Sequence, residues 1–324
     1  MNKQFWTLAL AVGTVLAAPA GAAPPHAGNR GLLMAVDQLP AALRKDVAAQ
    51  VAKQRQLAPA TFETVAAATG CTNDGYKLRR NPVPGCSTEL RALGPSHAWA
   101  LVSALVVAEP KTADGKLPYA SPQEKAAYTS AAIESLGYYR DALAAPVVRV
   151  ILLSGADLHW RVAAAALGRI GGDTELQVLS DLAKSSNARQ LAAVYGLGEC
   201  KRIAAAKVLA SQLGVSTEAA TVTQVANALG RVASAWAWQA IARQPPARQA
   251  EALDVQTVAA RAVAMALLTT TDSEAVEELT QALQMTEHPA MAAILAQTRA
   301  HADAAAAVRI DGAATRYASY IKRK

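Results

Sequence analysis

Apolar residues recur at helical spacing along most of this chain, and a Leu-Gly pair closes the pattern at a regular interval. The segment 159–172 reads HWRVAAAALGRIGG, an alanine-rich helical pattern that runs into Leu167 and Gly168. The same ending occurs three more times, at Leu136-Gly137, Leu197-Gly198 and Leu229-Gly230. Successive glycines of these pairs lie 31, 30 and 32 residues apart. Such a period predicts stacked helical hairpins, each of which buries its apolar face against its neighbours.

The four copies agree beyond the Leu-Gly pair. Apolar residues follow each glycine by two positions, and small or apolar residues precede it by five: Tyr139, Ile170, Cys200 and Val232, then Ala132, Ala163, Ala193 and Val225. A leucine and the residue three positions later share one helical face, and small residues let neighbouring helices approach closely. We expect each glycine to adopt a left-handed conformation that ends the first helix of its hairpin.

This pattern resembles the HEAT-like repeats of the phycobilisome lyase type, and the resemblance covers residues 122–245 best. It implies an all-α fold, a right-handed α-solenoid of antiparallel helix hairpins. It also implies an alternative function, in which a lyase-type enzyme or small-ligand binder would hold a small molecule in the groove of the solenoid. His159 or Cys200 would then be the acting side chain.

The first hairpin is expected to begin at Ser121-Pro122-Gln123-Glu124, a capping box with proline at the first helical position. We expect hairpins at 122–136 with 141–153, 158–167 with 174–183, 188–197 with 199–213, 217–229 with 234–243, 255–268 with 273–285, and 289–300 with 302–309. In the last two, Leu268 and Ala296 replace the glycine.

Four segments follow from this reading. They are a signal peptide at 1–22, a helical N-terminal cap with a disulfide loop at 23–120, the HEAT-like solenoid at 121–310, and a basic C-terminal helix at 311–324. A cap is expected because the end of a solenoid would otherwise expose an apolar face.

The N-terminus has the pattern of an export signal. Lys3 supplies a positive charge, an apolar run follows at 5–18, and Ala20-Gly21-Ala22 is a small-residue cleavage site. The run is too short to favour a membrane span, although a retained anchor is the alternative. We therefore expect a periplasmic or secreted protein with no transmembrane span after cleavage.

Composition and charge narrow the class of partner. Hydrophobic residues make up 52% of the chain but aromatic residues only 5%, which suits closely packed helices. The formal net charge is +7. In an exported protein this charge favours an acidic protein face, with weak contact to an anionic envelope surface, over nucleic acid. The alternative is that these charges only solvate an alanine-rich surface.

The three cysteines have different expected roles. Cys71 and Cys86 enclose a turn-rich loop with little apolar material, so an exported protein would join them in a disulfide. A metal site is the alternative, but it lacks a second ligand pair. Cys200 occupies a repeat position that is apolar in the other copies, which predicts a buried core thiol.

No catalytic or cofactor-binding constellation is evident in the sequence. The five histidines are separated, without the spacing of a helical zinc site, and neither G-x-S-x-G nor a phosphate-binding loop occurs. Gly168, Gly171 and Gly172 are better explained as a helix-ending turn. We therefore expect no enzyme activity, no cofactor and no metal.

The remaining candidates for function lie on the surface. Trp236 and Trp238 are two residues apart on one predicted helix, so their side chains point about 200° apart. Trp238 has an apolar neighbour, Ile241, three positions later and is expected to be buried. Trp236 is then expected to be an exposed anchor for a partner.

Basic residues recur beside the repeat glycines. Arg169 and Arg231 occupy the same repeat position, and Lys201 and Arg202 follow the third glycine. With Trp236 they predict a basic, aromatic surface that binds another protein with an acidic face. Arginines at a helix end can instead cap its last carbonyl groups. The expected function is an exported protein-interaction scaffold, or an inhibitor or immunity-type binding protein.

Overall fold

The computed structural model describes residues 38–68, 86–241 and 250–324. The chain divides into a unit at 1–30, which lies outside these ranges, and a unit at 31–324. The proposed signal peptide and Cys71 therefore lie outside the described residues. All regular elements in the described ranges are helices. None of those helices is both long enough and apolar enough to cross a bilayer.

Four described helices precede the repeats, and the last two of them pack against the first repeat helix. They are α1 (Ala41–Leu57), α2 (Pro59–Ala66), α3 (Ser87–Leu93) and α4 (Ala98–Val106), with a 3₁₀ turn at Pro95–His97. Helix α4 is buried along most of its length because α1 and α2 pack on it and it packs in turn on α5. The hydroxyl group of Tyr128 in α5 donates a hydrogen bond to the carbonyl of Val65, at 3.0 Å.

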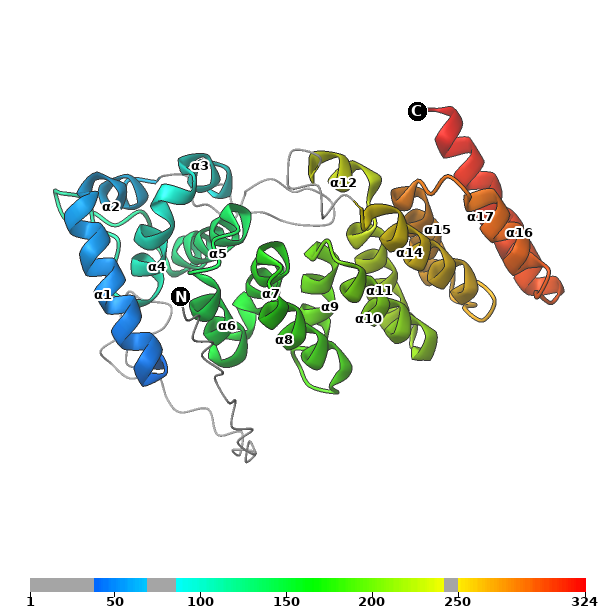
Figure 1. Cartoon of the computed structure of the whole chain (residues 1–324), viewed down its shortest axis with the longest axis horizontal. Coiled ribbons are helices and arrows are strands. Elements are labelled where there is room, and N and C mark those ends of the chain that lie inside the picture. Colours follow the sequence, from blue (N-terminus) through cyan, green and yellow to red (C-terminus); the bar gives the residue numbers. More distant parts are fainter. Residues whose placement is uncertain (1–37, 69–85, 242–249) are drawn as a thin grey trace, which may run out of the picture. The chain divides into compact units, whose positions relative to one another are not determined.

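The rest of the unit consists of helices, most of which pack in two rows (Figure 1). They are α5 (Pro122–Tyr139), α6 (Ala145–Ser154), α7 (Trp160–Ile170), α8 (Asp173–Lys184), α9 (Gln190–Glu199), α10 (Ile203–Val215), α11 (Ala219–Val232), α12 (Ala235–Ile241), α14 (Ala252–Ala266), α15 (Ser273–Thr286), α16 (Met291–Arg299) and α17 (Ala304–Lys322). A 3₁₀ turn at Asp157–His159 precedes α7.

One row, which we call the inner row, contains α5, α7, α9, α11 and α15, and each of these helices packs on the next. The second row contains α6, α8, α10 and α14, which pack behind the inner row, with α10 also packed on α8 and α14. The arrangement is an α-solenoid of helix hairpins, which confirms the predicted fold class. The predicted capping box is also present, since Ser121 Oγ accepts from the Glu124 N–H at 3.2 Å.

The predicted pairing is wrong for α11. Residues 234–243 were expected to return as the second helix of the fourth hairpin, but α12 belongs to neither row and makes only slight contact with α15. Helix α14 takes the second-row place beside α10, and α15 takes the inner-row place beside α11. The helices expected to pair at 255–268 with 273–285 and at 289–300 with 302–309 do pack on each other, as α14 with α15 and α16 with α17. In the first of these pairs, however, the earlier helix lies in the second row and the later helix in the inner row.

The repeat glycines have a different role from the predicted one. Gly137, Gly168, Gly198 and Gly230 all lie inside helices, and none has a positive φ. They allow close approach instead: a Cβ added to Gly168 would lie 2.0 Å from the carbonyl oxygen of Gly196 in the next inner-row helix. Glycine is needed at this position because any side chain would push the two helices apart.

Each repeat glycine docks on a small residue of the following helix. Added Cβ atoms at the glycines would meet Ala166, Gly196, Ala228 and Ala282 in turn. The first three of these residues stand two positions before the next repeat glycine. By the same register, Ala282 stands two positions before Gln284, so Gln284 occupies the glycine position of α15. The expected replacement of this glycine by Leu268 is therefore incorrect.

Candidate functional site

A chain of ion pairs runs across the inner row. Arg91 pairs with Glu134 of α5, Glu134 Oε1 lies 3.3 Å from Arg169 of α7, Arg169 lies 3.2 Å from Glu199 of α9, and Glu199 lies 3.1 Å from Arg231 of α11. We call these five residues the ion-pair ladder. Its charges alternate from one residue to the next, so each internal member contacts two opposite charges.

The repeat register explains three members of the ladder. Arg169, Glu199 and Arg231 each follow a repeat glycine directly, at the ends of consecutive inner-row helices. Because these helices approach closely in register, equivalent residues meet. Their side chains are only 21%, 18% and 11% exposed. The guanidinium group of Arg231 also lies 3.6 Å from the centre of the Tyr195 ring, a cation–π contact.

The electrostatics of Glu199 depend on its cationic neighbours. Burial alone would raise the pKa of this carboxyl group, but Arg169, Arg231 and Lys201 lower it to about 2. Burial in turn lowers the pKa of Lys201 to about 8. The Lys201 ammonium group donates hydrogen bonds to the carbonyls of Gly198 and Arg231, so it links α9 to α11.

The basic residues expected to form an exposed surface are instead engaged in contacts within the protein. Arg169 and Arg231 are engaged in the ladder, and Lys201 is engaged with backbone carbonyls. Arg202 is 28% exposed and pairs with Asp173 at 3.2 Å and Glu251 at 3.9 Å. The sequence signal that had been missed is Glu199, which stands between the two arginines at the same repeat position.

Of the predicted binding residues, Trp236 is the one whose side chain is largely exposed to solvent. It is 75% exposed, whereas Trp238 is 6% exposed. The Trp238 indole N–H donates to the carbonyl of Val232 at 2.9 Å, which fixes α12 to the end of α11. The expected burial of one tryptophan and exposure of the other are thus confirmed.

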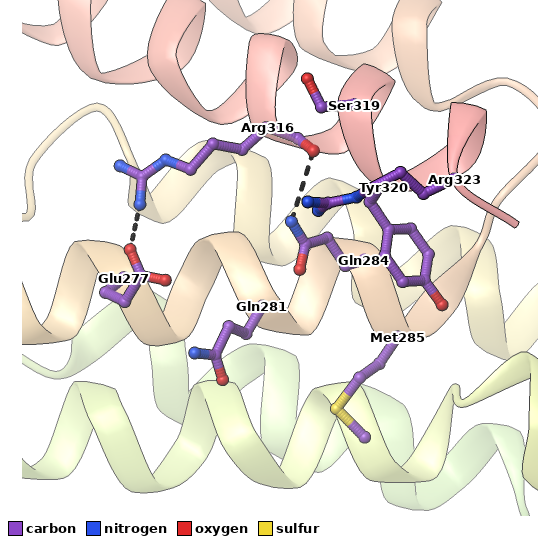
Figure 2. A pocket seen from close by; sticks show the side chains of 8 residues that line it. All are labelled: Glu277, Gln281, Gln284, Met285, Arg316, Ser319, Tyr320 and Arg323. Atoms are coloured by element: carbon purple, nitrogen blue, oxygen red, sulfur yellow. Dashed lines mark hydrogen bonds and ion pairs between the residues drawn. The ribbon is translucent and has the colours of Figure 1, made fainter.

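A groove of about 550 Å³ lies between α15 and α17 (Figure 2). Its lining residues are Glu277, Gln281, Gln284, Met285, Arg316, Ser319, Tyr320 and Arg323. It opens where the repeat glycine is replaced by Gln284. The glutamine side chain cannot allow the close approach seen between the earlier inner-row helices, so α17 packs less closely on α15.

Polar groups line this groove. Arg316 pairs with Glu277, and the Gln284 amide nitrogen donates to the carbonyl of Arg316 at 3.4 Å. Gln281 Oε1 is buried and accepts no hydrogen bond. Sequence reasoning missed the groove because it assigned the glycine position of this repeat to Leu268, after α14, instead of to Gln284 in α15.

The side chains expected to act in a lyase-type enzyme do not line the groove. His159 is 5% exposed, with Nδ1 at 3.3 Å from Ser130 Oγ, and burial lowers its pKa to about 4. Cys200 is fully buried, as predicted for a core thiol. Within the three described ranges, no group of His, Cys, Asp and Glu side chains is arranged as a metal site would require.

No family model matches the sequence, and no curated protein matches it. Among solved structures, the chain is similar to human deoxyhypusine hydroxylase in complex with glycerol. The identity is 16%, the alignment covers 82% of this chain and 97% of that chain, and the TM-score is 0.28. The matched protein is an enzyme, whereas we expected this chain to have no catalytic chemistry, and we do not carry that expectation further. Similarity at this level gives no activity to this chain.

Proposed function

We propose that this chain is an exported helical-repeat protein that binds another protein through a surface centred on Trp236. The observation that carries the proposal is the 75% exposure of this tryptophan on a helix outside both rows of the solenoid. Large aromatic side chains contribute strongly to protein interfaces because they bury a large area with few rotatable bonds. A partner could cover Trp236 without disturbing the inner row.

The finer features of the proposal come from the sequence. The HEAT-like repeats of the phycobilisome lyase type remain the proposed relatives, and the proposed role is that of a scaffold or of an inhibitor or immunity-type binding protein. The net charge of +7 supports a partner with an acidic face. The N-terminal pattern supports a periplasmic or secreted location. A disulfide between Cys71 and Cys86 is part of this proposal, and Cys86 is 1% exposed.

The two tryptophans provide a matched test of the binding surface. Trp236→Ala should change the free energy of unfolding by no more than about 0.5 kcal/mol but should strongly reduce capture of the native partner. Trp238→Ala should destabilise the protein by about 3 kcal/mol, because it removes a buried side chain and its hydrogen bond to Val232. Urea unfolding curves and cross-linking yields from the native envelope measure the two effects. Unchanged capture by Trp236→Ala would exclude this surface.

Export has a separate test. If the signal is cleaved after Ala22, the native protein should begin at or near Ala23. Intact-mass measurement of the protein purified from its own cells should show the loss of this segment. A full-length mass in the membrane fraction would support the retained anchor instead.

A further inference from the structure

We infer that His288 is a pH-sensitive latch, which holds the C-terminal hairpin of α16 and α17 on the solenoid while its imidazole ring is neutral and loosens that hairpin when the ring is protonated. The latch is separate from the Trp236 surface, since the hydrogen bonds of His288 involve other residues. Three observations support it: the place of His288 between helices, the hydrogen bonds of its ring, and the charges around its turn.

The first observation is the position of His288 in the turn between α15 and α16. Its ring contacts Thr257 of α14, and its carbonyl accepts a hydrogen bond from the Tyr317 hydroxyl of α17 at 3.2 Å. The residue is only 6% exposed. The preceding residue, Glu287, has a positive φ of 46°, which is unfavourable for a residue other than glycine, so contacts must hold this turn. A change at His288 therefore acts directly on the attachment of α16 to α14 and of α17 to α15.

The second observation is that the hydrogen bonds of the ring require its neutral form. The backbone N–H of Ala290 donates to Nδ1 at 3.0 Å, so Nδ1 must be an unprotonated acceptor. Nε2 lies 2.9 Å from Thr257 Oγ1, whose own hydrogen is donated to the carbonyl of Leu253 at 2.7 Å. Thr257 therefore accepts from Nε2–H. A second proton, on Nδ1, would face the Ala290 N–H, and two donors cannot form a hydrogen bond with each other.

The third observation concerns charge. The charged and titratable groups that meet this turn are Arg261 of α14, Glu287, and Tyr317, Tyr320 and Lys324 of the C-terminal segment. Arg261 would repel an imidazolium ring, and the Glu287 carboxylate is already bound by the Tyr320 hydroxyl and the Lys324 ammonium group. Burial, and then Arg261, lower the pKa of His288 from its ordinary value of 6.5. The neutral ring therefore gives its full stabilisation above about pH 6.5, and this contribution is lost as the pH falls through the lowered pKa of the folded protein.

The test follows amide hydrogen exchange of the full chain at pH 7.5 and pH 5.5, with each rate corrected for the intrinsic rate of its amide. Amides of α16 and α17 should exchange several-fold faster at pH 5.5, and at most about tenfold faster for each pH unit below the ordinary pKa. His288→Asn should abolish this increase. Asparagine does not titrate, yet its side-chain oxygen can accept from the N–H two residues later, as Nδ1 does from Ala290.

His301→Asn is the matched control. It removes an exposed histidine from the turn between α16 and α17, so it should keep the full increase in exchange. Both variants retain His159, whose burial also opposes protonation, so any acid-induced loosening of the whole fold is common to them.

A second measurement needs no variant. The ¹⁵N chemical shifts of the His288 ring should show the hydrogen on Nε2 at pH 7.5, and protonation of Nδ1 only below pH 6.5. The inference is overturned if Nδ1 carries the hydrogen at pH 7.5, if exchange in α16 and α17 does not rise at pH 5.5, if His288→Asn keeps the rise, or if His301→Asn loses it.

Discussion

Replacing Gly168 by alanine is expected to destabilise the solenoid by about 3 kcal/mol or more. The new Cβ would lie 2.0 Å from the carbonyl oxygen of Gly196 and 3.2 Å from the Cβ of Glu199. A backbone carbonyl inside a helix cannot move away as the end of a flexible side chain can. Helices α7 and α9 must therefore separate, and the ion pair between Arg169 and Glu199 would lengthen. The midpoint of urea unfolding, read by circular dichroism, measures the loss.

Gly312→Ala is the matched control for this prediction. Gly312 also lies inside a helix, α17, but an added Cβ would meet no atom within 4 Å. Alanine has the higher helix propensity, so this variant should be neutral or more stable by up to about 1 kcal/mol. If Gly168→Ala were as stable as Gly312→Ala, the close approach of α7 and α9 would not be a requirement of the fold.

The repeats could be predicted from the sequence because period and small residues are local signals. The role of the glycines could not, because a helix end and a close helix contact both favour glycine. The deciding observation is the small residue two positions before each glycine, such as Ala166 or Gly196, which receives the preceding helix. A pattern that links neighbouring repeats indicates packing between helices, whereas a turn would require only the glycine itself.

Residues 234–243 alone could not show whether α12 or α14 would take the place in the second row beside α10. Trp238 and Ile241 stand at helical spacing, so the segment predicts a helix in either arrangement. Whether that helix joins a row is decided by competition with α14, which buries Val255, Ala259 and Val263 completely. The longer apolar face of α14 occupies the second row, and α12 is left outside.

For a similar reason, the sequence predicted some residues of the candidate sites correctly and others wrongly. The exposure of Trp236 followed from the geometry of one helix. The burial of Arg169 and Arg231 depends on a third residue, Glu199, which pairs with both of them. That pairing is evident only when the repeats are stacked in space. The groove required the correct register of α15. Reasoning from single helices therefore failed for the features that depend on contacts between repeats.

Replacing Glu199 by glutamine is expected to destabilise the protein by about 3–5 kcal/mol at neutral pH, because Arg169 and Arg231 would lose their shared counter-charge in a buried position. The pH dependence gives an independent measure. The pKa of Glu199 is about 2 in the folded protein, against 4.5 for an ordinary glutamate. The ion pairs therefore stabilise the fold fully above about pH 4.5, and this contribution, about 3 kcal/mol, is lost as the pH falls toward 2.

The Glu199→Gln variant has no carboxyl group to titrate at this position, so its free energy of unfolding should fall less steeply than that of the unsubstituted protein between pH 4.5 and pH 2. Asp311→Asn provides the matched control. Asp311 pairs with Arg299 at 2.6 Å, but both side chains are about half exposed and solvent screens the pair, so this variant should change the stability far less than Glu199→Gln does. Urea titrations across this pH range measure both variants. Equal stability losses in the two variants, or parallel pH curves for Glu199→Gln and the unsubstituted protein, would show that the ion-pair ladder does not hold the inner row together.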